Sequence, residues 1–417
     1  MKTNIITSID LGSSTVRCVV ADVSQDDGQV RVLGAGIVPS AGMRRGAVVD
    51  INDAADAIAS AVEKAEQMSG EKVRNAIVSI GGVGIIVKET QGVIAIGRAD
   101  GEVNEDDVVR VIDAAQAISI PTNNEIIHVI PRSFRLDDQR DIKDPVGLRG
   151  VRLEVDAVIV EAPGNHVKNL TSAMERAAVG VEDFIIEPLA AAEATLTKKQ
   201  KELGVVMINL GASTTSLAVY EEGELIHTSV LPVGSDFITH DIAIGLRTEI
   251  DIAERVKFEF GSADINSVDK KSMIDLSHFD DREKDLVYHQ HVLEIIQARL
   301  DEIFDLVVKE LEKIGKDQLL PAGAVLTGGG AHLPHIVDFA KEKLRLPVSI
   351  GQPAHLLGVV DHVDDSSYAT VVGLLLWALH EGNHGGSHFG TGAISSLGGK
   401  INDMSAKLRS TFGKFLP

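Results

Sequence analysis

The chain has 417 residues, of which 44% are hydrophobic, and this length predicts two lobes rather than one ordinary core. It carries 61 acidic against 40 basic residues, a formal net charge of -21, so its surface as a whole should repel nucleic acid and anionic lipid, and any membrane contact must be local. The one cysteine, Cys18, cannot form an intramolecular disulfide, which is typical of a reducing compartment, and it is expected to fill the core.

No segment is expected to direct secretion or to cross a membrane. Met1 is followed by a strand pattern, without a basic stretch leading into a long apolar one. The best apolar run, Val371 to Leu379, is about half of the roughly 18 residues that a spanning helix needs.

The first hundred residues predict a mixed α/β domain. One helix is expected over 53–69, because Ala54, Ile58 and Ala61 recur with the period of a helix that lies on a sheet. Strands are expected over 5–10, 15–23, 30–39 and 75–81.

The next segment indicates a small inserted domain and then a new start. Acidic residues at 104–107 begin a helix that runs to Ala117. Strands over 125–136 and 151–161 flank a turn-rich connector at 143–150. From Val167 the predicted order is a helix to 178, a strand to 187, a helix from Ala190, and an apolar strand over 205–210 that begins a second half.

Two seven-residue segments resemble each other, Ile9 to Thr15 and Ile208 to Thr214, and both lie between apolar strands. Their small residues allow close backbone approach, while N–H groups and hydroxyls can point at phosphate oxygens. The pair predicts an internal duplication in which two hairpins hold a polyphosphate. The simpler alternative is that each segment is only a tight turn.

A third glycine-rich element, Thr327 to Gly330, follows an apolar strand and precedes a helix expected over 336–343. Its glycines would admit a flat ring system against the backbone. A plain linker is the alternative, but the two hairpins favour a nucleotide site.

These motifs resemble, in order, the two phosphate motifs and the adenosine motif of the actin, sugar-kinase and Hsp70 superfamily. Segments 187–192 and 369–375 are similar to the two connecting segments of that fold. The resemblance implies a duplicated, two-lobe, ribonuclease H-like α/β fold.

Within the superfamily the chain is most similar to the bacterial cell division family FtsA, over residues 1 to about 380 and the last residues. The segments that carry this resemblance are 128–131, 144–148, 150–153, 233–243 and 253–257. The resemblance implies a first lobe (1–83, 166–200, 368–382), an inserted subdomain (84–165), a second-lobe core (201–230, 316–367), a further subdomain (231–315), a linker (383–399) and a final helix (400–417).

The resemblance also implies roles for single residues. Asp10 would act on Mg²⁺ through water, and Glu254 and Lys257 would bracket the ribose and adenine. On physical grounds alone, Glu254 and Lys257 are more often an exposed ion pair on a helix. The residues implied to bind ATP are Asp10, Gly12, Ser13, Ser14, Asn209, Gly211, Ala212, Ser213, Thr214, Glu254, Lys257, Gly328, Gly329 and Gly330.

Position 209 departs from the family pattern, since many relatives have a carboxylate there and this chain has asparagine. Asparagine lacks the negative charge that a hard cation favours. Glu187 is the candidate that orients the attacking water, and the alternative is that it caps the turn before Pro188. At most a slow ATPase is expected.

The last 18 residues predict an amphipathic membrane-binding helix after a glycine-rich linker. They hold four basic residues and one acid, the composition of an interfacial helix on anionic lipid. Docking on the body or on another protein is the alternative. The residues expected at the membrane are Ile401, Met404, Lys407, Leu408, Arg409, Phe412, Lys414 and Phe415.

The resemblance implies a protein that polymerises and tethers FtsZ filaments, the Z ring, to the cytoplasmic face of the membrane at the septum. The FtsZ C-terminal peptide is expected on the subdomain 231–315, where Arg299 matches an arginine the family uses, although a helix-surface arginine is ordinarily only solvated. Later division proteins are expected on the inserted subdomain. The alternatives are a pilus-assembly-type or other soluble actin-like ATPase, a sugar or acetate kinase, and a chaperone-like ATPase.

Overall fold

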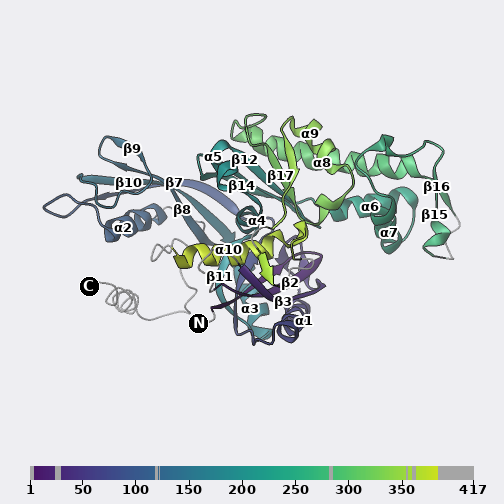
Figure 1. Ribbon diagram of the computed structural model, residues 1–417, viewed down its shortest axis with the longest axis horizontal. Helices are drawn as coiled ribbons and strands as arrows, with labels where there is room; N and C mark the ends of the chain where they lie inside the picture. The colour runs from purple at the N-terminus through teal and green to yellow at the C-terminus, as the bar shows by residue number, and fades with distance from the viewer. Residues whose placement is uncertain are drawn as a thin grey trace.

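The computed structural model describes residues 4–23, 30–117, 121, 123–280, 285–353, 356–358 and 363–383, with side chains up to 379. The predicted linker and final helix therefore lie outside the described residues, apart from the backbone of Asn383. Figure 1 shows two central sheets that lie side by side, with one smaller part at each end of the long axis.

The two central sheets have the same topology. The first has the order β11-β6-β1-β2-β3-β19 and the second the order β14-β13-β12-β17-β18. In each, three consecutive antiparallel strands are followed by a parallel strand beside the first of them. The strands of the first sheet are β1 (Ile5–Leu11), β2 (Thr15–Asp22), β3 (Val30–Pro39), β6 (Asn75–Ile80), β11 (Gly180–Ile186) and β19 (Leu356–Gly358). Those of the second are β12 (Val205–Leu210), β13 (Thr215–Glu221), β14 (Glu224–Leu231), β17 (Ala324–Thr327) and β18 (Val348–Ile350).

This repeat confirms the predicted duplication, and the register makes it specific. Asp10 lies opposite Arg17 in the first hairpin, and Asn209 lies opposite Ser216 in the second. The two phosphate segments therefore occupy equivalent turns, one in each lobe.

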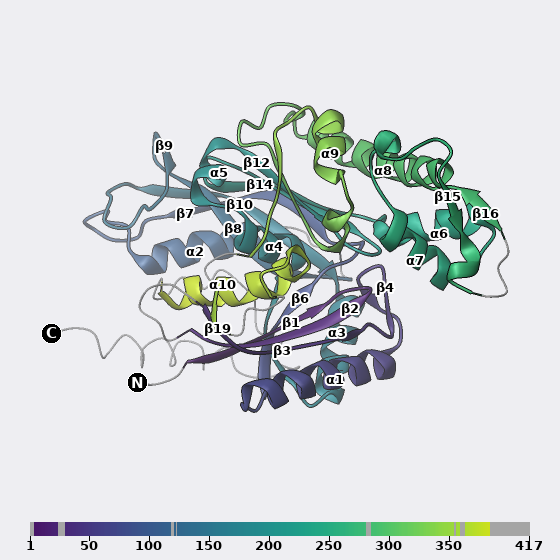
Figure 2. The same cartoon turned by 45° about the vertical axis from the view of Figure 1, so that its right-hand side comes forward.

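Helix α1 (Ile51–Ser69) covers one face of the first sheet, together with α3 (Gly164–Arg176) (Figure 2). Asp50 caps the start of α1, and Gly70 ends it with a left-handed φ of 74°. The buried face of α1 is mainly alanine, and it lies so close to β3 that a Cβ at Gly36 would meet the carbonyl oxygen of Ala61 at 1.9 Å.

The two predicted connecting segments form α4 (Glu187–Thr195) and α10 (Ala369–Asn383), which pack against each other between the sheets. A Cβ at Gly373 would stand 1.7 Å from the carbonyl oxygen of Ala190, so glycine is required for this contact. Helix α4 begins at Glu187, three residues before the predicted start, because a proline in the first turn is compatible with helical φ. One hydrophobic core runs from the first sheet through both helices to Val205 and Met207 of the second.

Strand β12 is apolar throughout because both of its faces are buried. Val205 and Met207 face α4, while Val206, Ile208 and Leu210 belong to a second core with α8 (His289–Lys313) and α9 (Ile336–Leu344). The same core holds the helices α6 (Ser235–Leu246) and α7 (Ile250–Phe260), so the predicted subdomain 231–315 shares its core with the second sheet. The remaining short elements of this lobe are α5 (Lys198–Leu203), β15 (Met273–Asp275), β16 (Leu286–Tyr288) and the 3-10 turns η1 (Ile265–Ser267), η2 (Leu276–His278), η3 (Gly329–His332) and η4 (Ser366–Tyr368).

The inserted segment forms its own antiparallel sheet of order β7-β10-β8-β9, with a separate core under α2 (Glu105–Gln116). Asn104 and Asp107 form a capping box at the start of α2. The strands are β7 (Ile86–Ala95), β8 (Asn124–Leu136), β9 (Gln139–Ile142) and β10 (Arg152–Pro163), all within the predicted 84–165.

Arg132 of β8 ties this subdomain to the second lobe. Its Nε donates to the carbonyl oxygen of Leu225 at 2.9 Å and its Nη2 to that of Ile226 at 2.6 Å. These carbonyls lie where β14 departs from regular register with β13, so they are available to a side chain.

Within the described residues, no helix combines the length and the apolar character needed to span a bilayer.

Candidate nucleotide-binding site

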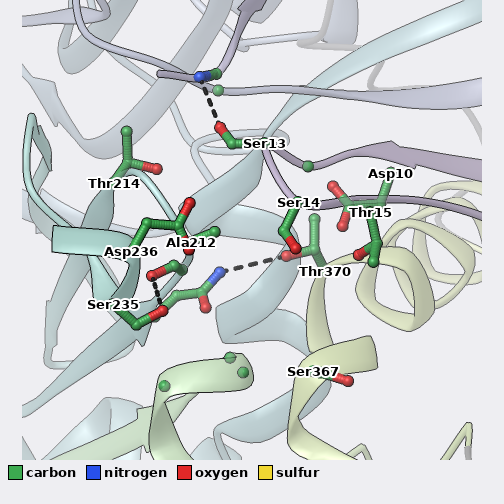
Figure 3. A pocket seen from close by; sticks show the side chains of 18 of the residues that line it. Asp10, Ser13, Ser14, Thr15, Ala212, Thr214, Ser235, Asp236, Ser367 and Thr370 are labelled. Atoms are coloured by element: carbon green, nitrogen blue, oxygen red, sulfur yellow. Dashed lines mark hydrogen bonds between the residues drawn. The ribbon is translucent and has the colours of Figure 1, made fainter. Parts of the chain in front are cut away.

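A cavity of about 370 Å³ opens where the two lobes meet. It is lined by the turn after β1, the turn after β12, the start of α6, helix α7 and the glycine segment after β17. Figure 3 shows Asp10, Ser14 and Thr15 on one side and Ala212, Thr214 and Asp236 on the other. The structure thus brings together every residue implied to bind ATP except Ser213, which does not line the cavity.

Both hairpin turns need glycine for the same reason. A Cβ at Gly12 would lie 2.7 Å from the carbonyl oxygen of Thr15, and a Cβ at Gly211 would lie 2.9 Å from that of Thr214. Ser13 serves a different purpose, because its Oγ accepts the backbone N–H of Gly46 at 3.0 Å. Gly46 belongs to the short hairpin of β4 (Met43–Arg44) and β5 (Ala47–Val48), which the first phosphate turn thereby holds beside the cavity.

Asp10 lies at the end of β1 and is only 7% exposed. Ser79 of β6 donates its hydroxyl to Oδ1 of Asp10 at 2.8 Å. Burial raises the pKa of Asp10, while the charge of Arg17 and the hydroxyl of Ser79 act in the opposite direction.

Arg17 is a cavity residue that the sequence reasoning missed. Its guanidinium stacks on Tyr368, 4.9 Å from the ring centroid, and its Nε is buried without a hydrogen-bond partner among the described residues. Arg17 lies opposite Asp10 in the hairpin and corresponds to Ser216 in the second copy, a relationship that the strand register shows.

Glu187 is the first residue of α4 and is half-buried beside the cavity. The hydroxyl of Ser216 donates to its Oε1 at 2.8 Å, and the side-chain amide of Asn209 donates to the same oxygen. The pKa of Glu187 is raised to about 7, mainly by burial and also by the charge of Asp10, against the opposing effect of the two donors. Glu187 therefore does more than cap the turn before Pro188.

The start of α6 was also missed as part of the site. The N–H groups of Ser235 and Asp236 donate to the carbonyls of Gly211 and Ala212, which fixes the helix start against the second hairpin. Ser235 and Asp236 line the cavity, so the positive end of the α6 dipole lies beside it. In the sequence, the stretch 233–243 indicates the family but not a place in the site.

Lys257 and Glu254 do not form the simple surface ion pair considered above. Lys257 is half-buried and donates to Oγ1 of Thr239 at 2.6 Å, while Glu254 is exposed, and both line the cavity. Burial lowers the pKa of Lys257, and the charges of Asp236 and Glu254 oppose that effect.

The three glycines after β17 play different parts. A Cβ at Gly328, whose φ is 84°, would lie 2.1 Å from Oδ1 of Asn209, and one at Gly330 would lie 2.4 Å from the side chain of Leu210. These two glycines let the segment pack on the second phosphate strand. A Cβ added at Gly329 would meet no atom within 4 Å, so this position leaves open space at the cavity.

Arg299 lies outside the cavity, on α8. Its guanidinium binds Asp241 through two contacts, 2.5 Å from Nε to Oδ2 and 2.9 Å from Nη2 to Oδ1, and it also pairs with Glu302. It stacks on Phe237 with 5.6 Å to the ring centroid. The arginine is therefore held in one orientation by two carboxylates.

The comparison with protein families gives two matches. Residues 206–373 match the model described as cell division protein FtsA, and residues 82–161 match the SHS2 domain inserted in FTSA.

Similar curated proteins carry the same name over nearly the whole chain. The chain is 37% identical to the cell division protein FtsA of Pseudomonas aeruginosa, covering 91% of this chain and 90% of that protein. It is 36% identical to the one of Bacillus subtilis, covering 89% and 82%, and 30% identical to the one of Escherichia coli, covering 98% of both.

Solved structures share the fold at low identity. The PilM–PilN type IV pilus biogenesis complex has a chain with a TM-score of 0.65 and 15% identity, covering 91% of this chain and 99% of that one. MreB5 of Spiroplasma citri bound to ADP has a TM-score of 0.53 and 16% identity, covering 92% and 99%. The actin-like fold expected from the sequence is thereby confirmed.

Proposed function

The chain belongs to the family of cell division protein FtsA, and from that premise we propose that it binds ATP between its lobes, assembles with itself and tethers FtsZ filaments to the cytoplasmic face of the membrane at the septum. Membership of the FtsA family is favoured over a sugar or acetate kinase and over a chaperone-like ATPase. It is also favoured over a pilus-assembly protein, because the similarity to PilM concerns the fold alone.

The observation that carries nucleotide binding is the cavity between the two equivalent hairpins. Its polar groups suit a polyphosphate: backbone N–H groups and hydroxyls from both turns, and the cations Arg17 and Lys257. Gly329 leaves room for a flat ring at the other end.

The residues present also fit Mg²⁺ carried by the phosphates. Within the described residues no cluster of three or more metal-ligating side chains exists, so the protein offers single carboxylates rather than a closed cage. Mg²⁺ is commonly held by one or two carboxylates and substrate phosphates, and Asp10 is placed for that, through water. The ion would neutralise charge on the phosphates.

Glu187 is the proposed general base for a slow hydrolysis. Its raised pKa places its proton equilibrium near neutral pH, which suits proton abstraction from a water. Asn209 and Ser216 fix its carboxylate from the second lobe, so its orientation depends on how the lobes meet.

Calorimetric titration tests the nucleotide proposal. Mg-ATP should bind with a dissociation constant at least tenfold below that of AMP, because the two hairpins face the phosphates, and each such factor is about 1.4 kcal/mol. Equal affinities, or no binding of ATP, would remove the nucleotide role from the proposal.

The partner side of the proposal rests on family membership and on Arg299. FtsZ's C-terminal peptide would bind the face of α6 and α8, where an acidic group of the peptide would replace Asp241 on the guanidinium. Later division proteins would bind the inserted subdomain. Both roles are proposals for this chain.

Membrane attachment is proposed for residues 400–417, which lie outside the described residues. Their apolar side chains and four basic residues suit reversible binding to anionic lipid. One such helix is a weak anchor, and an assembly with one helix per subunit gains avidity.

A further inference from the structure

His128 lies in β8 of the inserted subdomain, opens the stretch 128–131 that distinguishes the family, and has no role in the function proposed above. It is 1% exposed and does not line the cavity. Burying a polar imidazole is unfavourable unless it is hydrogen-bonded, so its partners are of interest.

The ring of His128 accepts a hydrogen bond from the backbone of the first lobe. The N–H of Ile186 donates to Nε2 at 3.2 Å. Ile186 ends β11, an edge strand that pairs with β6 on one side only, so His128 supplies an acceptor on the other side. Because Nε2 accepts, the ring is neutral, with its proton on Nδ1.

This bond falls one residue before Glu187. Ile186 is also the residue that precedes α4, whose start has no side-chain cap. The N–H belongs to the Ile185–Ile186 peptide, so the inserted subdomain holds the backbone one peptide before Glu187, while the Glu187 carboxylate is held by Asn209 and Ser216 of the second lobe. Three parts of the chain converge on one residue.

The same imidazole packs on the second connecting helix. Its centroid lies 5.9 Å from that of Trp377 on α10, with the planes inclined by 42°. His128 therefore contacts α10 and the residue that precedes α4, and these two helices pack on each other. Burial lowers the pKa of His128 to about 4, which keeps it a neutral acceptor at physiological pH.

We propose that His128 is a positioning residue for Glu187, through which the placement of the inserted subdomain controls the hydrolytic competence of the nucleotide site. This inference rests on the proposed function, since it assigns regulation to the same site. Its alternative is that His128 only fills the space between the inserted sheet and α10.

The test uses two amides that differ in reach. In His128→Gln, Oε1 stands three bonds from Cβ, as Nε2 does in histidine, so it can accept from Ile186. In His128→Asn the oxygen is one bond shorter and falls out of reach. Arg132→Ala is the matched control, because it removes a different contact of the same subdomain, with β14, and leaves the bond between His128 and Ile186 in place.

Phosphate release at saturating Mg-ATP, the affinity for Mg-ATP and the unfolding midpoint followed by Trp377, the one tryptophan, are measured on the full chain. We expect His128→Asn to release phosphate at least about tenfold more slowly with an affinity within about twofold of wild type. His128→Gln should recover to within about threefold, and Arg132→Ala should keep the wild-type rate.

Three results would overturn the inference: an unchanged rate in His128→Asn, equal slowing in Gln and Asn variants of equal unfolding midpoint, or equal slowing in Arg132→Ala. If His128→Asn does not fold, the comparison of His128→Gln with wild type and Arg132→Ala still decides, because a slow but folded Gln variant contradicts the hydrogen-bond role. A wild-type rate no higher than that of Glu187→Gln would instead remove the proposed hydrolysis, and the inference with it.

Discussion

The side-chain amide of Asn209 donates a hydrogen bond to Oε1 of Glu187, and this contact joins the second phosphate hairpin to the first residue of α4. For metal binding alone, asparagine at this position is unfavourable because it lacks the negative charge of a carboxylate. In the structure it is a donor to the half-buried carboxylate of Glu187, and a carboxylate in its place would repel Glu187.

Replacing Glu187 by glutamine should abolish most of the hydrolysis and leave ATP binding nearly unchanged. A lost general base costs about 10²–10⁴ in rate, while the affinity for Mg-ATP should stay within about threefold. Because the pKa of Glu187 is raised to about 7, its carboxylate form increases as pH rises through 7, so the wild-type rate should rise from pH 6 to 8. Phosphate release across that range checks this, and a flat wild-type profile would argue against Glu187 as the base.

Asn209→Asp should shift that pH profile to higher pH. A second carboxylate in contact with Glu187 disfavours ionisation of the pair, so the rising limb should move upward by about one pH unit. Asn209→Ala is the control, since it removes the donor without adding charge. A profile that moves to lower pH in the aspartate variant would contradict the arrangement.

Arg17→Ala should raise the dissociation constant for Mg-ATP by about tenfold or more, because it removes a half-buried cation that lines the cavity. Arg17→Lys should retain part of the affinity as a point charge. Arg31→Ala, an exposed arginine of the same lobe, is the matched control for net charge. If calorimetry gives equal losses for Arg17 and Arg31, the guanidinium acts only through the overall charge.

Gly328→Ala and Gly329→Ala should separate stability from binding. The added methyl at Gly328 meets Asn209 at 2.1 Å on a left-handed backbone, so the free energy of unfolding should fall by about 2 kcal/mol. At Gly329 the methyl meets nothing within 4 Å, so stability should change by no more than about 0.5 kcal/mol while Mg-ATP affinity falls several-fold. Denaturant unfolding and calorimetry measure both, and the reverse order of stabilities would be inconsistent with the packing described.

Asp241→Ala should tighten binding of the FtsZ C-terminal peptide, because Arg299 is then released from its bidentate partner. Arg299→Ala should weaken it by about 1–3 kcal/mol, or roughly 5- to 150-fold. Fluorescence anisotropy with a labelled peptide gives both values. Weakening by both substitutions would indicate that the Arg299–Asp241 pair is needed only to keep α6 and α8 in place.

The sequence predicted the duplication because the same local pattern occurs in it twice: an apolar strand, a turn of small residues and a second strand. It also placed the glycine segment and the two connecting helices, since each has its own composition. Arg17 escaped because its role depends on cross-strand register with Asp10 and on the approach of Tyr368, more than 300 residues away in the chain. The start of α6 escaped because its contact with the second hairpin is made by backbone groups, which no side-chain pattern records.

The role proposed for His128 also depends on contacts between segments that are distant in the sequence. The sequence marked its stretch as distinctive, but only the meeting of three chain segments gives it a partner at Ile186 and a neighbour at Trp377.

The most direct test of the proposed function is co-sedimentation of FtsZ with anionic liposomes in Mg-ATP, in the presence of the intact chain or of a chain that ends at Gly399. The account predicts that FtsZ pellets with liposomes only when the intact chain is present, and that Arg299→Ala reduces the amount. Equal pelleting of FtsZ with the intact and the shortened chain would contradict the tether.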